Sequence, residues 1–205
     1  MIEGRPVGVM GANCYLVYCR ETKKAAVIDP GAEGKKIYRW VLEKELKVEY
    51  ILLTHGHADH IGAVDELKEL LGAKVGIHSA DADMLTDDRQ NLSYYFAPVI
   101  KMQPADMLLY DGQELTVGHE KITVLATPGH SRGSVSFLTA DGVISGDTLF
   151  AGSIGRTDFP GGSLEQLLQG VEQKLLVLPD DTPVYPGHGE ATTIGTEKRV
   201  NPFLV

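Results

Sequence analysis

The feature that most constrains the fold is a cluster of metal-ligand side chains placed directly after a buried strand. Residues 49–54 (EYILLT) form an apolar run of strand length, and the sequence HGHADH follows without a break. His55 and His57 are two positions apart in an extended loop, which allows their imidazoles to point the same way. Asp59 and His60 come at the start of a predicted helix and face a neighbouring point. The chain has seven histidines, and three of them in this cluster predict a metal site rather than a solvated turn.

Three further candidate ligands follow other predicted strands in the same way. They are His130 in TPGH, Asp147 in SGD and His188 in YPGHG. Taken alone, each segment is typical of a turn with a surface side chain. Together they place ligands at the mouths of several strands, where a scaffold displays a functional site.

The size of this set predicts two divalent metal ions. One tetrahedral zinc takes about four ligands, so a larger set implies two metals with one ligand shared. Asp147 is the natural shared ligand, because a carboxylate has two oxygens. Imidazole and carboxylate ligands without thiolate favour Zn²⁺, with Fe or Mn as alternatives.

Outside these ligands, the chain predicts short strands interspersed with helices. Apolar runs at residues 14–19 and 24–29 flank a polar turn, which is typical of a hairpin. Helices are expected over residues 34–47 and 61–71, and a third from Ser163, with the spacing of a capping box. Further strands are expected over residues 74–77, 122–126, 134–139, 143–145 and 183–185, a short helix over 79–85, and irregular chain over 91–111. This mixture favours sheets covered by helices over a purely parallel sheet.

The composition limits the classes of partner that we expect the chain to bind. The net charge of −9 repels phosphate backbones and argues against nucleic acid. No apolar run approaches the roughly 20 residues of a membrane span, and residues 1–13 lack the regions of a signal peptide. Cys14 and Cys19 are too few for a disulfide framework and are typical of small apolar strand residues. We therefore expect a cytoplasmic protein with a small-molecule substrate and no nucleic-acid or membrane partner. The sequence does not predict the oligomeric state.

The ligand pattern resembles that of the metallo-β-lactamase superfamily. The sequence HGHADH matches its H-x-H-x-D-H motif in full. Residues 155–162 (GRTDFPGG) and 185–189 (YPGHG) are similar to short bacterial members of the glyoxalase II-like branch, the hydroxyacylglutathione hydrolases. The resemblance spans nearly the whole chain and implies an α/β fold, a four-layer αββα sandwich, as a single domain over residues 1–205. Full-length glyoxalase II adds a C-terminal helical domain that helps to bind glutathione, and the short tail after His188 predicts that this domain is missing.

The resemblance also assigns roles to the candidate ligands. Asp147 bridges the two metals, and Asp59 orients a metal-bound hydroxide that attacks the substrate. The implied reaction is hydrolysis of S-D-lactoylglutathione or a related acyl thioester. The resemblance gives the first metal His55, His57 and His130, and the second metal Asp59, His60 and His188. Asp29, just after a strand, is expected to make a turn or a supporting hydrogen bond rather than to bind metal.

Two substrate contacts are open hypotheses. Arg156 is a candidate to hold a substrate carboxylate, because its guanidinium is an anion fork on a glycine-rich loop. A structural salt bridge with Asp158 explains it equally well. Tyr94 and Tyr95, with Phe96, are candidates to roof the active site, and packing under an irregular loop is the favoured alternative.

Other functions share this fold. A persulfide dioxygenase with a single iron is the main alternative, and the ligand residues alone do not separate it from a hydrolase. Electron-transfer members with iron pairs usually have Glu in place of His57, and the acidic charge argues against a nuclease. A metal-binding module without catalysis is disfavoured because every ligand of the motif set is intact.

Overall fold

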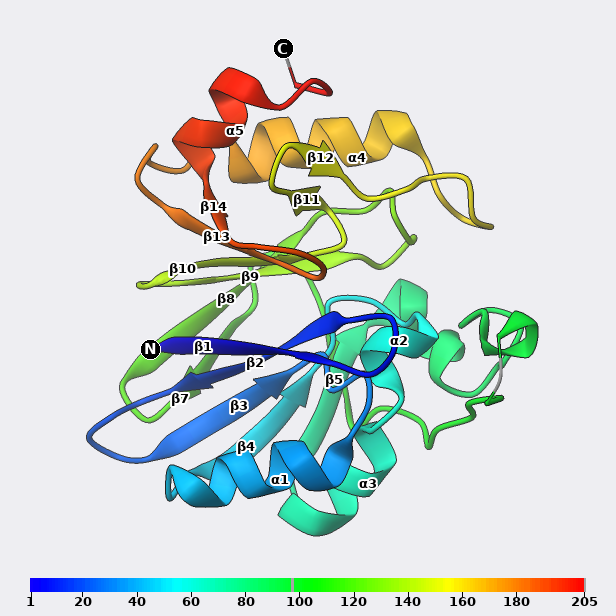
Figure 1. Cartoon of the computed structure of the whole chain (residues 1–205), viewed down its shortest axis with the longest axis vertical. Coiled ribbons are helices and arrows are strands. Elements are labelled where there is room, and N and C mark those ends of the chain that lie inside the picture. The colour runs from blue at the N-terminus through cyan, green and yellow to red at the C-terminus, as the bar shows by residue number, and fades with distance from the viewer. Residues whose placement is uncertain (97, 205) are drawn as a thin grey trace.

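The computed structural model describes the chain except residues 97 and 205. Two six-stranded sheets lie face to face, and helices cover the outer face of each sheet (Figure 1). These four layers confirm the predicted αββα sandwich. Within the described residues, no helix combines the length and the apolar character that a bilayer crossing requires.

The first sheet begins as a meander and continues as parallel strands. Its strands, in spatial order, are β1 (Ile2–Val7), β2 (Ala12–Tyr18), β3 (Lys24–Ile28), β4 (Lys47–Leu52), β5 (Lys74–His78) and β6 (Met107–Leu109). Strands β2 and β3 form the predicted hairpin, and β1 pairs antiparallel with β2. Strands β3 to β6 are parallel, because each crossover returns the chain to the end of the sheet at which the previous strand began. The crossovers contain α1 (Gly34–Glu43), α2 (Ala58–Ile61) and α3 (Val64–Leu71).

The second sheet is antiparallel apart from one pair. Its strands, in spatial order, are β14 (Thr192–Thr193), β13 (Pro183–Pro186), β10 (Gly142–Gly146), β9 (Val135–Thr139), β8 (Glu120–Ala126) and β7 (Glu114–Val117). Strands β10 and β13 are parallel, and α4 (Leu164–Gly170) with the π-helical turn η3 (Val171–Leu175) connects them. Helix α5 (Ile194–Val200) lies beside α4 on the outer face (Figure 1). A separate small hairpin consists of β11 (Leu149–Phe150) and β12 (Ser153–Ile154).

The prediction of one continuous helix over residues 61–71 is wrong, because the chain forms two helices there. Helix α2 begins at Ala58, and the chain breaks before α3. At the break, the amide of Ala63 donates to the carbonyl of Pro30 at 2.9 Å instead of continuing the helix. Gly62 permits this contact, since a Cβ there would lie 2.3 Å from the carbonyl oxygen of Gly31. Packing against a distant loop therefore overrides the local helical pattern.

Other predicted elements agree with the structure more closely. Helix α4 begins after Ser163, whose hydroxyl accepts from the amide of Gln166 at 3.3 Å. The short helix over residues 79–85 is the 3-10 helix η1 (Ser79–Leu85). Residues 91–111, expected to be irregular, contain the 3-10 turn η2 (Ser93–Tyr95) and strand β6. Both are too short to show a hydrophobic period.

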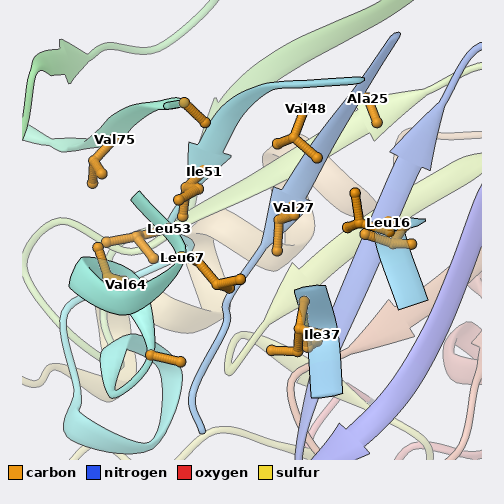
Figure 2. Close-up of a cluster of buried hydrophobic side chains, with 14 of the residues drawn as sticks. Leu16, Ala25, Val27, Ile37, Val48, Ile51, Leu53, Val64, Leu67 and Val75 are labelled. Atoms are coloured by element: carbon orange, nitrogen blue, oxygen red, sulfur yellow. The ribbon is translucent and has the colours of Figure 1, made fainter. Parts of the chain in front are cut away.

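The core follows from alternation along the strands. Successive strand residues point to opposite faces, so Leu16 of β2 faces α1 and α3, whereas Val17 faces the second sheet. Figure 2 shows Leu16 and Val27 packed toward Ile37 of α1. A third cluster joins β10 and β13 to α4 and α5. Cys14 and Cys19 are buried and free, as the sequence predicts.

Candidate metal centre

The structure brings all seven candidate ligands together from four separate segments. These segments follow β4, β8, β10 and β13 along the chain. Three groups of side chains have ligand atoms within 4.8 Å of one another. Two of them divide six of the candidate ligands, and the third, Asp29, His55 and His60, overlaps both. The first ligand group is His55, His57 and His130, and the second ligand group is Asp59, His60 and His188. This is the division that the family resemblance implies.

Asp147 lies between the two groups. Its Oδ1 is 3.4 Å from His60 Nε2, and its Oδ2 is 3.5 Å from His130 Nε2 and 3.7 Å from His188 Nε2. One carboxylate therefore faces ligands of both groups, as a bridging ligand must. The predicted shared role of Asp147 fits this position.

The donor atoms fit divalent cations. Among the described residues, four buried side-chain atoms have no hydrogen-bond partner: Trp40 Nε1, His55 Nε2, His60 Nε2 and Asp147 Oδ1. Buried polar atoms need a partner, and leaving one without costs roughly 1–3 kcal/mol. Three of the four belong to the predicted ligand set, and an imidazole or carboxylate lone pair is satisfied by a metal ion.

The electrostatics of the two groups differ. Burial, followed by the neighbouring His130 and His60, lowers the pKa of His57 to about 3, so this ring is neutral. Burial opposes protonation of His60, but Asp147, Asp59 and Asp29 outweigh it and raise its pKa to about 10. The second group thus attracts positive charge strongly, which suits a cation site.

Supporting hydrogen bonds orient three of the imidazoles. The hydroxyl of Thr54 donates to Asp29 Oδ2 at 2.5 Å, so it accepts from His55 Nδ1 at 3.1 Å. His60 Nδ1 donates to Asp29 Oδ2 at 3.1 Å, and His130 Nδ1 donates to the carbonyl of Arg156 at 2.8 Å. Nδ1 of each ring is engaged in this way, so Nε2 is the nitrogen available to a metal ion; His130 Nε2 also lies 2.9 Å from His57 Nδ1 of the same ligand group. The expectation that Asp29 supports the site fits these contacts, because its oxygens already accept from Thr54 and His60.

Sequence reasoning missed Asp81. This buried carboxylate accepts from the amide of Gly56 at 3.2 Å, the hydroxyl of Ser131 at 2.6 Å and the amide of Gly133 at 2.7 Å. It thereby ties the HGHADH loop to the loop that carries His130. Burial raises its pKa despite these donors. No local signal marks Asp81, because its partners lie 25 to 52 residues away in the sequence.

Two glycines allow the backbone to close around Asp147. A Cβ at Gly187 would lie 2.0 Å from Asp147 Oδ1, and a Cβ at Gly155 would lie 1.7 Å from the carbonyl oxygen of Asp147. A larger residue at Gly187 would displace the Asp147 carboxylate, and one at Gly155 would displace its backbone. Gly187 of YPGHG and Gly155 of GRTDFPGG are therefore required by close approach.

The ligand groups form part of the wall of a cavity of about 550 Å³. The cavity is within the size range of small-molecule sites. Its apolar walls are Met10, Leu92, Phe96, Phe150, Ile154 and Phe159. Most of these residues belong to turns and short hairpins that the sequence did not predict as site residues.

Of the predicted substrate contacts, Arg156 lines the cavity, whereas Tyr94 and Tyr95 do not. Arg156 lines the cavity, but its Nε and Nη2 donate to Asp158 at 2.7 Å each, so the salt-bridge alternative describes it in this structure. Tyr94 and Tyr95 are exposed and meet edge to face, and neither is among the described residues that line the cavity. Phe96, the third candidate for the roof, does line it. The exposure of the two tyrosines does not match the packing alternative either.

Comparison with known proteins identifies the family. Residues 7–188 match the profile of the metallo-β-lactamase superfamily. The probable metallo-hydrolase YqgX of Bacillus subtilis is 45% identical over 97% of this chain and 95% of that protein. Hydroxyacylglutathione hydrolase GloC of Haemophilus influenzae is 38% identical over 99% of this chain and 97% of that protein. The chain belongs to the metallo-β-lactamase superfamily and is a metallo-hydrolase of that family.

Solved structures agree. The BLEG-1 B3 metallo-β-lactamase has a TM-score of 0.95 and 40% identity, with both chains fully covered. TTHA1623 in a di-iron-bound form has a TM-score of 0.87 and 38% identity, covering 98% of this chain and 100% of that one. ETHE1 from Myxococcus xanthus has a TM-score of 0.82 and 33% identity, covering 98% of this chain and 83% of that one. These likenesses confirm the metallo-β-lactamase fold.

Proposed function

We propose that this chain is a glyoxalase II-like thioesterase that hydrolyses S-D-lactoylglutathione or a related acyl thioester with two divalent metal ions, zinc being favoured. The observation that carries the proposal is the pair of ligand groups joined by Asp147 at the wall of a small-molecule cavity. The likeness to GloC supports the choice of a thioester. The predicted single domain and cytoplasmic location stay predictions.

The first ligand group would hold one cation and the second ligand group the other, with Asp147 between them. When bound, two such cations lower the pKa of a water and polarise a carbonyl group. Hydrolysis adds the water oxygen to the acyl carbon, breaks the C–S bond, and releases a carboxylate, a thiol and a proton.

The chain itself orients the reactants. Asp59 lines the cavity and faces His188 Nε2 at 3.1 Å, so its carboxylate is placed to orient a water toward the substrate. Phe150, Ile154 and Phe159 surround the acyl group with apolar surface and exclude other waters. The thiolate is a good leaving group, so no protein nucleophile is required.

The thiol carrier is the less constrained half of the substrate. Among the described residues that line the cavity, Arg156 is the only arginine or lysine. Glutathione and other anionic thiols need a cationic partner, and Arg156 can supply one at the cavity edge despite its pairing with Asp158.

The test combines metal analysis with thiol release from S-D-lactoylglutathione. We expect two metal ions per chain, and activity that is lost on chelation and restored by zinc. His57→Ala should lose activity, whereas the matched control His119→Ala, at an exposed histidine outside both ligand groups, should keep it. Full turnover by His57→Ala would contradict the proposed site.

A single-iron dioxygenase stays a second candidate, because the chain also resembles ETHE1. The di-iron form of TTHA1623 supports iron as an alternative metal, but for a two-metal site. Oxygen uptake with glutathione persulfide separates the two functions. One iron per chain with oxygen consumption and no thioester hydrolysis would favour the dioxygenase.

A further inference from the structure

A second cavity of about 290 Å³ adjoins the active-site cavity. The two cavities share Met10, Ala58, Asp59 and Phe96 as wall residues, so the second begins beside the second ligand group. It extends from there between the turn after β1 and the loop after η2. Its further apolar walls are Val7, Val9, Ala32, Pro98 and Ile100.

The boundary between the cavities is apolar apart from Asp59, and its large apolar side chains are open to solvent. The exposed fraction is 57% for Met10 and 55% for Phe96, and Val9 is fully exposed. Large apolar side chains that are exposed together beside a cavity are typical of a ligand groove. They would become buried if an apolar group of the substrate ran from one cavity into the other.

Charge distinguishes the two ends of this path. Arg156 lines the active-site cavity but not the second cavity. Asp59 lines both cavities, and Glu33, which lines the second cavity alone, is paired with Lys36. Among its described residues, the second cavity therefore offers no arginine or lysine to an anionic thiol carrier, whereas the active-site cavity offers Arg156. The group that suits the second cavity is the uncharged, acyl half of the thioester.

We propose that the second cavity holds the acyl chain of the substrate, and that the preferred substrates are thioesters of medium-length apolar acyl groups. This inference rests on the proposed thioesterase function and narrows it. A lactoyl group is short and polar, so it reaches the metal ligands without using the second cavity. An aliphatic chain of several carbons passes Met10 and Phe96 and buries their exposed surface.

The experiment is a chain-length series on the metal-loaded enzyme. Lactoyl, butyryl, hexanoyl and octanoyl thioesters are compared as glutathione and as coenzyme A derivatives. Each methylene that leaves water is expected to raise kcat/KM by up to about fourfold, giving at least a tenfold gain from butyryl to octanoyl with both thiols. A flat or falling series with lactoyl hydrolysis intact overturns this inference alone. If no thioester is hydrolysed, the proposed function fails as well.

A variant that fills the second cavity tests whether the dependence of kcat/KM on chain length arises there. Ala32 lines the second cavity only, and its Cβ lies close to Gly8, where an added Cβ would come within 2.9 Å of it. Ala32→Leu should lower the octanoyl-to-butyryl ratio of kcat/KM about tenfold or more. Ala191→Leu adds the same volume at an exposed alanine that lines neither cavity, and its ratio should match the native one. An unchanged ratio in a folded Ala32→Leu overturns the assignment.

A binding measurement keeps the test independent of turnover and of that variant's folding. S-octylglutathione and S-butylglutathione are thioethers that place an alkyl chain where the acyl chain lies and are not hydrolysed. The native enzyme should bind the octyl compound at least tenfold more tightly. Equal affinity would overturn the inference.

Discussion

The floor of the active site and its rim are built in opposite ways. At the floor, His55 and His60 have exposed fractions of 1% and 0%, and hydrogen bonds to Thr54 and Asp29 fix their Nδ1 atoms. At the rim, Met10 and Phe96 are more than half exposed and lie on turns. The floor is a buried polar network, and the rim consists of apolar side chains on turns and short hairpins, of which Met10 and Phe96 are exposed and Ile154 is buried.

This difference separates chemistry from substrate choice. A buried polar network tolerates little change, because each lost partner leaves another group unsatisfied. Loop residues on the surface vary more freely and carry specificity. Substitutions at the floor should therefore affect metal binding and kcat, whereas substitutions at the rim should affect KM.

The largest expected effect is at the bridging position. Asp147→Ala removes the one carboxylate that faces both ligand groups. We expect thioester hydrolysis to fall to background and the metal content to drop below two ions per chain, measured by mass spectrometry. The matched control is Asp181→Ala, at an exposed aspartate outside the ligand groups. Unimpaired hydrolysis by Asp147→Ala would remove the basis for a bridged site.

The next effect concerns the support of the floor. Asp29→Asn keeps the shape of the side chain but loses the carboxylate that holds His60 Nδ1. Loss of such an outer hydrogen bond is expected to weaken metal affinity about 10- to 100-fold. Chelator competition measures the affinity, and excess zinc should restore most of the hydrolysis. Unchanged affinity would show that Asp29 only supports the loop through Thr54.

The floor has a clear sequence signal, because its candidate ligands stand in one contiguous motif and at strand ends. The HGHADH run, followed by His130, Asp147 and His188, predicts the candidate ligands, and the structure places these side chains near one another. The continuous apolar run of β2 and the helical spacing of α1 and α4 likewise predict the layers, since these elements are long enough to show a pattern.

The rim could not be predicted in the same way. Phe150 and Ile154 lie on the two-residue strands β11 and β12, which are too short for any hydrophobic period. Met10 and Phe96 are apolar residues in turns, and only the folded chain brings them together beside Asp59. Asp81 supports the floor through contacts that are distant in sequence, so it escaped prediction for the same reason.

A moderate effect on stability and KM is expected at Glu197, which holds the hairpin of the rim. Buried Glu197 accepts from the amide of Gly152 at 2.8 Å and from Asn201 Nδ2 at 2.8 Å, and it thereby fixes the β11–β12 hairpin that carries Phe150 and Ile154. Glu197→Gln should destabilise the fold by roughly 1–3 kcal/mol, because a buried donor loses its acceptor.

The kinetic consequence of that substitution tests the division between floor and rim. Movement of the hairpin should raise KM several-fold while kcat and metal content stay close to native, as steady-state kinetics and metal analysis would show. A selective loss of kcat with unchanged KM would instead place Glu197 with the floor.

The smallest expected effect belongs to Arg156, at the outer edge of the rim. Its guanidinium lies 3.9 Å from the ring centre of Phe159 and is paired with Asp158 in solvent. Exposed charges interact weakly, so Arg156→Ala should raise KM for coenzyme A thioesters by about fivefold or less, with kcat unchanged. The effect should shrink as salt is added, because screening weakens the attraction of an anionic thiol. Arg156→Lys keeps the charge without the planar fork and should be intermediate.

A comparison of charged and uncharged thiol carriers tests whether Arg156 acts through its charge. Thioesters of N-acetylcysteamine carry no charge, so their KM should be the same in the native enzyme and in Arg156→Ala. Asp158→Asn releases the guanidinium from its partner and should lower KM for coenzyme A thioesters while leaving the uncharged series unaltered. If Arg156→Ala raised KM equally for the charged and the uncharged thioesters, Arg156 would act by holding Phe159 in the cavity wall. Other residues of the rim would then recognise the thiol carrier.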